Sequence, residues 1–219
     1  DATITYDVTL PYSSAGYDFT PVKIEGQAAA VAGTALQMPV SELANHIVAW
    51  SSAAPADGQM KFYSVNPADG TCTNQGSTAN GYGHWFDASG KIIGYGGSSY
   101  AYSEFSPSTL TFNVGQYPGR LKVGTTYTIS QALKYKRGDE TAVVRFIFNV
   151  KCVKAGEAAG YTVSSIKQSD VVTGVQSHAA ISPEQPKYIS TSGIRTLVPT
   201  KGIHVVTNAK GQNIKVLSK

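Results

Sequence analysis

The residues whose types and spacing best suit them to chemistry are aromatic, and they lie between positions 81 and 105. GYGHWFDASGKIIGYGGSSYAYSEF holds one tryptophan, two phenylalanines and four tyrosines among glycines and serines. Exposed Trp and Tyr rings beside glycine can bind a sugar, because the face of the aromatic ring stacks on the sugar's C–H groups. Polar side chains nearby can hydrogen-bond the sugar's hydroxyls. The candidate ligand-binding residues are Trp85, Tyr95, Tyr100, Tyr102, His84, Asp87 and Glu104.

The spacing divides these rings between two faces of a sheet. In a strand over 99–105, two tyrosines share a face with Glu104, and Phe105 lies on the other face. In the strand before it, Trp85 and Phe86 lie on opposite faces. The phenylalanines have no polar tip and are expected to point inward, which leaves Trp85 on a face where it is partly exposed. The alternative is that the tyrosines fill a core and satisfy their hydroxyls at its rim.

The sequence offers little for catalysis or metal binding. It has no Gly-x-Ser-x-Gly elbow, no phosphate-binding loop and no His-Glu-x-x-His motif, and its four histidines are isolated from one another. Asp87 and Glu104 are the one tempting carboxylate pair for a glycosidase, but Asp87 is explained by its hairpin turn. We therefore expect no catalytic residue, no metal and no cofactor, and a hydrolase is the least favoured reading.

Composition indicates an extracellular β-rich protein. Only 15% of the 219 residues are charged, and tyrosine occurs 13 times. The net charge of +4 comes from basic residues spread singly after residue 160, which argues against a nucleic-acid partner. No apolar run is long enough to span a bilayer. The chain starts at Asp1 without a leader, so we expect a mature or trimmed protein.

The elements that must position the aromatic residues are mostly predicted strands. ATITYDVTL alternates apolar and polar residues from the start of the chain. Further strands are expected near 60–65, 81–86, 91–95, 99–105, 109–115, 125–136 and 142–153. The last has the clearest core face, formed by Val144, Phe146, Phe148, Val150 and Cys152. Because a buried free thiol is common on such a face, a disulfide between Cys152 and Cys72 is the less favoured alternative.

Two short helices are predicted near the N-terminus. Small apolar residues recur at helical spacing over 25–37, and Pro39 should end that helix. Ser41 can cap a second helix over 41–48. Both helices are expected to cover a sheet.

Three regions are expected along the chain. Residues 1–155 form a β-sandwich domain with the two helices, residues 156–186 add strands and a linker, and residues 187–219 form a small β tail. A composition break at KAGEAAG and the prolines Pro183 and Pro186 mark these boundaries.

Several ordered motifs resemble a known family. GHWFD, YSEF, GQYPG and TYTISQAL, within residues of about 15–152, look like a domain family of unknown function from secreted and surface proteins of gut anaerobic bacteria. The resemblance implies an accessory role near polysaccharide-degrading enzymes. This chain has Gly94-Tyr95-Gly96 where the family pattern has a Trp-Gly pair, which bears on any binding role of that position. The tail, with KGI and IKVLSK, is similar to C-terminal modules linked to export and surface attachment.

The combined prediction is an α+β, mainly β protein: an antiparallel β-sandwich with two short N-terminal helices and a small C-terminal β module. The expected function is a non-catalytic, secreted or cell-surface module that binds glycan. The alternatives are an adhesion domain whose partner is a surface protein and, after it, a glycoside hydrolase.

Overall fold

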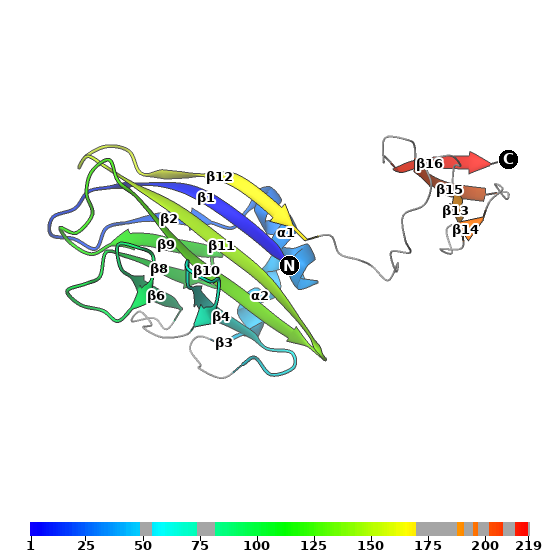
Figure 1. Cartoon of the computed structure of the whole chain (residues 1–219), viewed down its shortest axis with the longest axis horizontal. Coiled ribbons are helices and arrows are strands. Elements are labelled where there is room, and N and C mark those ends of the chain that lie inside the picture. The colour runs from blue at the N-terminus through cyan, green and yellow to red at the C-terminus, as the bar shows by residue number, and fades with distance from the viewer. Residues whose placement is uncertain are drawn as a thin grey trace. The chain divides into compact units, whose positions relative to one another are not determined.

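The computed structural model describes residues 1–48, 54–73 and 82–169, and the backbone of four strands within residues 188–218. It is mainly β, and the chain divides into two compact units, Asp1–Val171 and Val172–Lys219. Figure 1 shows the elements of both units.

The larger sheet of the first unit has seven strands, in the order β12-β1-β11-β10-β4-β3 with β5 paired to β4. These strands are β1 (Ala2–Pro11), β3 (Ile47–Val48), β4 (Met60–Val65), β5 (Cys72–Thr73), β10 (Thr126–Arg137), β11 (Glu140–Val153) and β12 (Gly160–Gln168). Strand β1 runs parallel to β11, and β3 runs parallel to β4. The prediction of an antiparallel sheet is wrong for these pairs, because alternation reports which side chains a strand buries and not the direction of its neighbour.

The smaller sheet of the first unit has five strands in the order β2-β9-β8-β6-β7. These strands are β2 (Phe19–Lys23), β6 (Gly83–Phe86), β7 (Ile92–Ile93), β8 (Ala101–Ser106) and β9 (Thr111–Gln116). All of its pairs are antiparallel. It carries most of the aromatic stretch that the sequence singled out.

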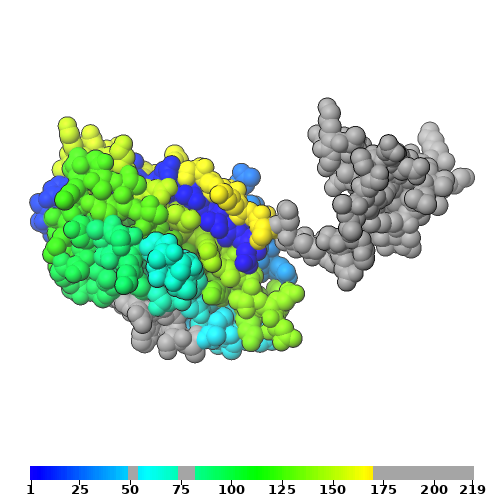
Figure 2. Space-filling view, viewed as in Figure 1, coloured from blue at the N-terminus to red at the C-terminus, as the bar shows by residue number. Residues whose placement is uncertain are grey.

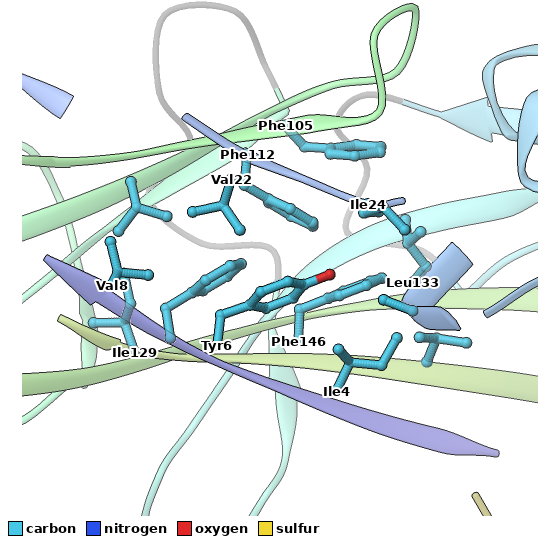
Figure 3. Close-up of a cluster of buried hydrophobic side chains, with 14 of the residues drawn as sticks. Ile4, Tyr6, Val8, Val22, Ile24, Phe105, Phe112, Ile129, Leu133 and Phe146 are labelled. Atoms are coloured by element: carbon cyan, nitrogen blue, oxygen red, sulfur yellow. The ribbon is translucent and has the colours of Figure 1, made fainter. Parts of the chain in front are cut away.

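The buried core lies between the two sheets. The alternating residues of β11, Val144, Phe146, Phe148, Val150 and Cys152, are fully buried, as predicted. From the smaller sheet, Phe112 places its ring 4.9 Å from that of Phe146 and 5.0 Å from that of Phe148. Figure 3 shows side chains of both sheets pointing toward one another, among them Tyr6 and Phe105. Cys152 and the half-buried Cys72 are both free thiols.

The helical segments differ from the two predicted helices. Helix α1 (Gly26–Leu36) buries Ala28, Ala32, Ala35 and Leu36, and it ends where Gln37 adopts a left-handed conformation. In place of a second helix over 41–48, the chain forms a 3-10 turn (η1, Val40–Glu42) and one helical turn (α2, Leu43–His46). The second segment is short because residues 47 and 48 leave it to pair with β4 as β3.

Strand β12 follows the composition break at residues 154–160 and extends the larger sheet. It pairs antiparallel with β1, with a register shift between Thr5 and Tyr6. Figure 2 shows β12, in yellow, lying beside β1, in blue. The first unit therefore continues to the end of β12.

The second unit contains a separate four-stranded antiparallel sheet, in the order β14-β13-β15-β16. Its strands are β13 (Tyr188–Ser190), β14 (Arg195–Thr196), β15 (Gly202–Thr207) and β16 (Asn213–Ser218). The longest pairing joins β15 to β16 from Gly202↔Ser218 to Thr207↔Asn213. Its described strands therefore find their hydrogen-bond partners within the unit. The predicted break at Pro183 and Pro186 lies outside the described residues.

We expect the first unit to fold without the second. A chain truncated after residue 171 should keep a single cooperative thermal transition close to that of the full chain, because its strands pair and its core closes within residues 1–168. Differential scanning calorimetry of both chains measures this. Aggregation of the truncated chain, or melting without cooperativity, would show that the second unit contributes to the core.

Candidate functional site

One row of paired residues crosses the whole smaller sheet on its outer face. Trp85 pairs with Ile93 on one side and with Tyr102 on the other. Tyr102 pairs with Gly115, and Gly115 pairs with Phe19 at the far edge. Directly paired residues project to the same side of a sheet, so these side chains share one face. The neighbouring positions, such as Phe86 and Phe105, enter the core instead, as their apolar tips predicted.

Four tyrosines surround Trp85 on this face. The ring centroids of Tyr102, Tyr95, Tyr117 and Tyr17 lie 4.9, 5.3, 6.0 and 6.1 Å from that of Trp85. We call these five residues the aromatic cluster. Trp85 is only 7% exposed, and it lies outside the main core. The expectation of a partly exposed Trp85 is therefore corrected: tyrosines enclose it, and their rings form the outer surface.

The exposed rings at this site are Tyr95 (63% exposed), Tyr17 (44%) and Phe19 (47%). These three rings are among the five large apolar side chains that are exposed in the described residues. The glycines beside Tyr95 leave space around it, since a Cβ built on Gly94 or Gly96 would meet no other atom within 4 Å. The cluster and Phe19 thus present accessible apolar rings on the outer face of the smaller sheet.

Hydrogen bonds hold the tyrosines of the cluster in place. The hydroxyls of Tyr17 and Tyr95 lie 2.7 Å apart, and the Tyr102 hydroxyl donates to the Tyr17 carbonyl oxygen at 2.7 Å. The bond to Tyr17 raises the pKa of Tyr95. Burial raises the pKa of Tyr102, and the nearby carboxylates of Glu104 and Asp18 raise it further. Both tyrosines are therefore neutral hydrogen-bonding groups at physiological pH.

Gly115 makes the close packing of Tyr102 possible. A Cβ at Gly115 would collide with the ring and hydroxyl of Tyr102, so the ring lies directly over the glycine backbone. A glycine in a strand often marks such a close approach. In this position the Tyr102 hydroxyl reaches the carbonyl oxygen of Tyr17.

Charged and polar groups border the aromatic cluster. The Arg120 guanidinium lies over the ring of Tyr117, with its carbon 5.6 Å from the ring centroid. On the next outward-facing row, Glu104 pairs with Gly83 and Asn113. Among the described residues, neither the Glu104 carboxylate nor the Asn113 amide has a hydrogen-bond or ion-pair partner. Both side chains are half-buried and can bond a ligand at this face.

Two candidate residues face inward, away from the cluster. His84 is 2% exposed; its ring stacks on Phe62 at 5.6 Å, and its Nδ1 accepts a hydrogen bond from Gln131 Nε2 at 3.0 Å. It points inward because it is two residues before Phe86 on the same strand. Tyr100 packs on Tyr127, with ring centroids 5.9 Å apart. Tyr100 precedes the first residue of β8. The strand alternation that was expected to place Tyr100 on the same face as Tyr102 therefore does not extend to Tyr100.

Asp87 is committed to its turn. Its Oδ1 accepts hydrogen bonds from the Ser89 amide at 2.8 Å, the Ser89 hydroxyl at 2.7 Å and the Lys91 amide at 3.0 Å. Gly90 completes the turn with a φ of 81°. This carboxylate orders the hairpin between β6 and β7, as its turn position predicted.

The sequence reasoning missed several residues of this face. Tyr17 and Tyr117 complete the aromatic cluster, Phe19 ends its row, and Arg120 borders it. Tyr17 and Phe19 lie far before the aromatic stretch in sequence, and Tyr117 and Arg120 lie beyond its end. The one available signal was that GQYPG, a motif of the family resemblance, contains Tyr117.

The described residues contain no group of three or more His, Cys, Asp or Glu side chains placed to hold a metal ion. Within the same residues, no helix has the length and apolar character needed to cross a lipid bilayer. The aromatic cluster itself offers stacking on aromatic rings together with a few hydrogen-bonding groups.

A family model described as a domain of unknown function, DUF4859, matches residues 16–141. The chain belongs to this family. The match begins one residue before Tyr17 and contains the whole aromatic cluster with Phe19 and Arg120. No curated protein and no solved structure matches the chain.

The folded unit is larger than the segment that defines DUF4859. Strands β1 and β12 lie outside residues 16–141, and so does most of β11. These strands occupy one side of the larger sheet, in the order β12-β1-β11. The smaller sheet, which bears the aromatic cluster, lies entirely within the DUF4859 match.

Proposed function

We propose that this protein is a non-catalytic, glycan-binding accessory module: a β-sandwich that binds carbohydrate on the outer face of its smaller sheet. The observation that carries the proposal is the position of exposed Tyr17 and Tyr95 against a buried Trp85, with exposed Phe19 at the far edge of the same row. Rings with polar tips suit a surface that is half apolar and half wet. Sugars have the same mixed character, with apolar C–H faces and polar hydroxyl edges.

The rings of the aromatic cluster are also held by hydrogen bonds before a ligand binds, which favours binding. The tyrosine hydroxyls bond to one another and to backbone, so the rings are held in position. Binding then immobilises few further side chains, which reduces the entropic cost of association. Glu104, Asn113 and Arg120 provide hydrogen-bonding groups at the border.

A non-catalytic role is supported by the contacts of Asp87 and Glu104, the candidate carboxylate pair for a glycosidase. Asp87 accepts three hydrogen bonds within its own turn, so it is not placed as a free acid, base or nucleophile. Glu104 alone does not make the two-carboxylate arrangement of a glycosidase. We further propose a secreted or outer-surface location in a gut anaerobe, on the resemblance of the motifs and of the tail.

Replacing Tyr95 with alanine is expected to weaken glycan binding about 5- to 20-fold, because it removes the most exposed ring of the cluster. The parent should bind at about micromolar to millimolar strength, as suits a shallow platform of a few rings. A glycan array with the purified protein identifies the ligand, and isothermal titration calorimetry measures both affinities.

The matched control is Val163→Ala, which removes an exposed apolar side chain from β12 on the other sheet. It should bind like the parent. A Tyr95→Ala protein that folds normally and keeps the parent's affinity would contradict the proposed site. Release of reducing sugar that is abolished by Glu104→Gln would instead favour the hydrolase.

A protein partner is the second candidate function. Phe19 favours it, because this ring is 47% exposed and has no polar tip. Large exposed apolar patches on soluble proteins mark interaction sites. The glycan array separates the two candidates when it is combined with a partner-binding assay. A protein that binds no glycan on the array, and that loses binding to its protein partner in Phe19→Ala, is an adhesion domain.

A further inference from the structure

We propose that the aromatic face binds a single, uncharged glycan chain whose successive sugars are twisted relative to one another, and not the flat surface of a crystalline polysaccharide. This inference rests on the proposed function and names the substrate class of the same site. Three observations carry it: the tilt of the rings, the extent of the row, and the charges around it.

The exposed rings are not coplanar. The planes of Tyr17 and Tyr95 differ by 38°, and the plane of the half-buried Tyr117 differs from that of Tyr95 by 44°. A crystalline surface presents its sugars in one plane, so it can stack on several rings only when those rings lie in one plane. Rings tilted by these angles instead match sugars that rotate along a free chain.

The tilt is held by the structure. The hydrogen bond between the Tyr17 and Tyr95 hydroxyls joins the two exposed rings directly, and both rings contact Trp85 beneath them. Tyr102 in turn holds the Tyr17 backbone through its hydroxyl. Flattening the two rings into one plane would break these contacts, so the surface cannot adapt easily to a flat ligand.

The row is long enough for an oligosaccharide. From Ile93 to Phe19 it crosses all five strands, in four steps of roughly 4.8 Å each, or about 19 Å. Phe19 supplies an exposed ring at its far end. The site therefore has room for several consecutive sugars, and affinity should rise with the length of the chain.

The charges around the row favour an uncharged ligand. Arg120 lies over Tyr117, whereas Asp18 and Glu104 lie near the Tyr102 hydroxyl. A chain of uronic acids or amino sugars carries repeated charge of one sign and would meet a like charge along this row. Neutral hydroxyls can bond to both kinds of group, so binding of the proposed ligand should depend little on salt.

The test compares soluble glycan chains with crystalline polysaccharides, and cellohexaose and cellulose share the same chemistry. Cellohexaose, xylohexaose, mannohexaose and an oligogalacturonate are titrated into the full chain, and microcrystalline cellulose and chitin are used in pull-down assays. We expect at least one uncharged hexasaccharide to bind, with an affinity that changes less than about twofold between roughly 50 and 500 mM NaCl. We expect no retention on the crystalline solids.

The outcomes separate this inference from the proposed function. Retention on a crystalline solid without binding of soluble chains, or binding of the oligogalacturonate alone, overturns the inference and leaves a glycan-binding module. Absence of binding to every glycan, soluble or crystalline, overturns both.

Variants test the geometry behind the inference. Tyr95→Phe keeps the ring and removes the hydroxyl that sets the tilt, and it should weaken hexasaccharide binding several-fold. Phe19→Ala shortens the row and should weaken binding of a hexasaccharide more than binding of a trisaccharide made of the same sugar, titrated in the same way. Equal losses for both lengths would place Phe19 outside the row, and Val163→Ala is the control for both variants.

Discussion

Replacing Phe148 with alanine is expected to lower the free energy of unfolding by about 3–5 kcal/mol. The Phe148 ring is fully buried at the centre of β11, stacks on Tyr6 at 5.7 Å and contacts Phe112 of the opposite sheet at 5.0 Å. Truncation removes these contacts and leaves a cavity that residues fixed on two sheets cannot readily close. Urea unfolding followed by circular dichroism measures the loss.

Ile147 provides a matched control for this prediction. It neighbours Phe148 on the same strand but lies on the half-buried outer face, so Ile147→Ala should cost clearly less. A loss below about 1 kcal/mol for Phe148→Ala, or equal losses for both variants, would mean that the inner and outer faces of β11 are reversed.

The contribution of His84 to the free energy of unfolding is expected to fall by about 2–3 kcal/mol between pH 7 and pH 4.5. Burial lowers the pKa of His84 from 6.5 to about 4. Between these two values the unfolded chain binds a proton that the folded protein does not, so acid favours unfolding. The contribution of this histidine is therefore fully present above pH 6.5 and is lost as the pH falls toward 4.

The measurement compares urea unfolding of the parent and of His84→Gln at both pH values. The variant should be less stable at pH 7, since it loses the ring that stacks on Phe62, but it should lose less stability on acidification. His46→Gln serves as a control at a half-buried histidine that contacts Tyr135 near the surface. Identical acid losses in the parent and in His84→Gln would contradict an interior His84.

The inner faces of the strands could be predicted from the sequence, because burial imposes a period of two that single residues report. The alternation in β11 identified its core face, and Phe86 and Phe105 were expected inside because an exposed phenyl ring has no polar compensation. Pairing direction could not be predicted in the same way. Strand β1 lies between β11 and β12, and nothing in ATITYDVTL indicates that one neighbour is parallel and the other antiparallel.

The site was only partly predictable, because it depends on long-range pairing. Tyr17 and Trp85 are 68 positions apart, and they meet only because β2 and β6 belong to one sheet. His84 looked like a hydrogen-bonding group for a ligand, yet its place in the alternation with Phe86 already favoured the core. The chemical type of His84 suggested a surface role, whereas its spacing from Phe86 favoured the core. The spacing was the stronger signal, because His84 is buried.

The enclosure of Trp85 by tyrosines also gives the protein an optical property. Four phenol rings within 6.1 Å of one indole will pass their excitation to it, so ultraviolet light absorbed by the cluster emerges as tryptophan emission. Trp50 is the second tryptophan and lies outside the described residues. In a Trp50→Phe background, anything that covers Tyr95 or displaces its ring will change the colour or intensity of this emission. The candidate site thus reports on its own occupancy without a label.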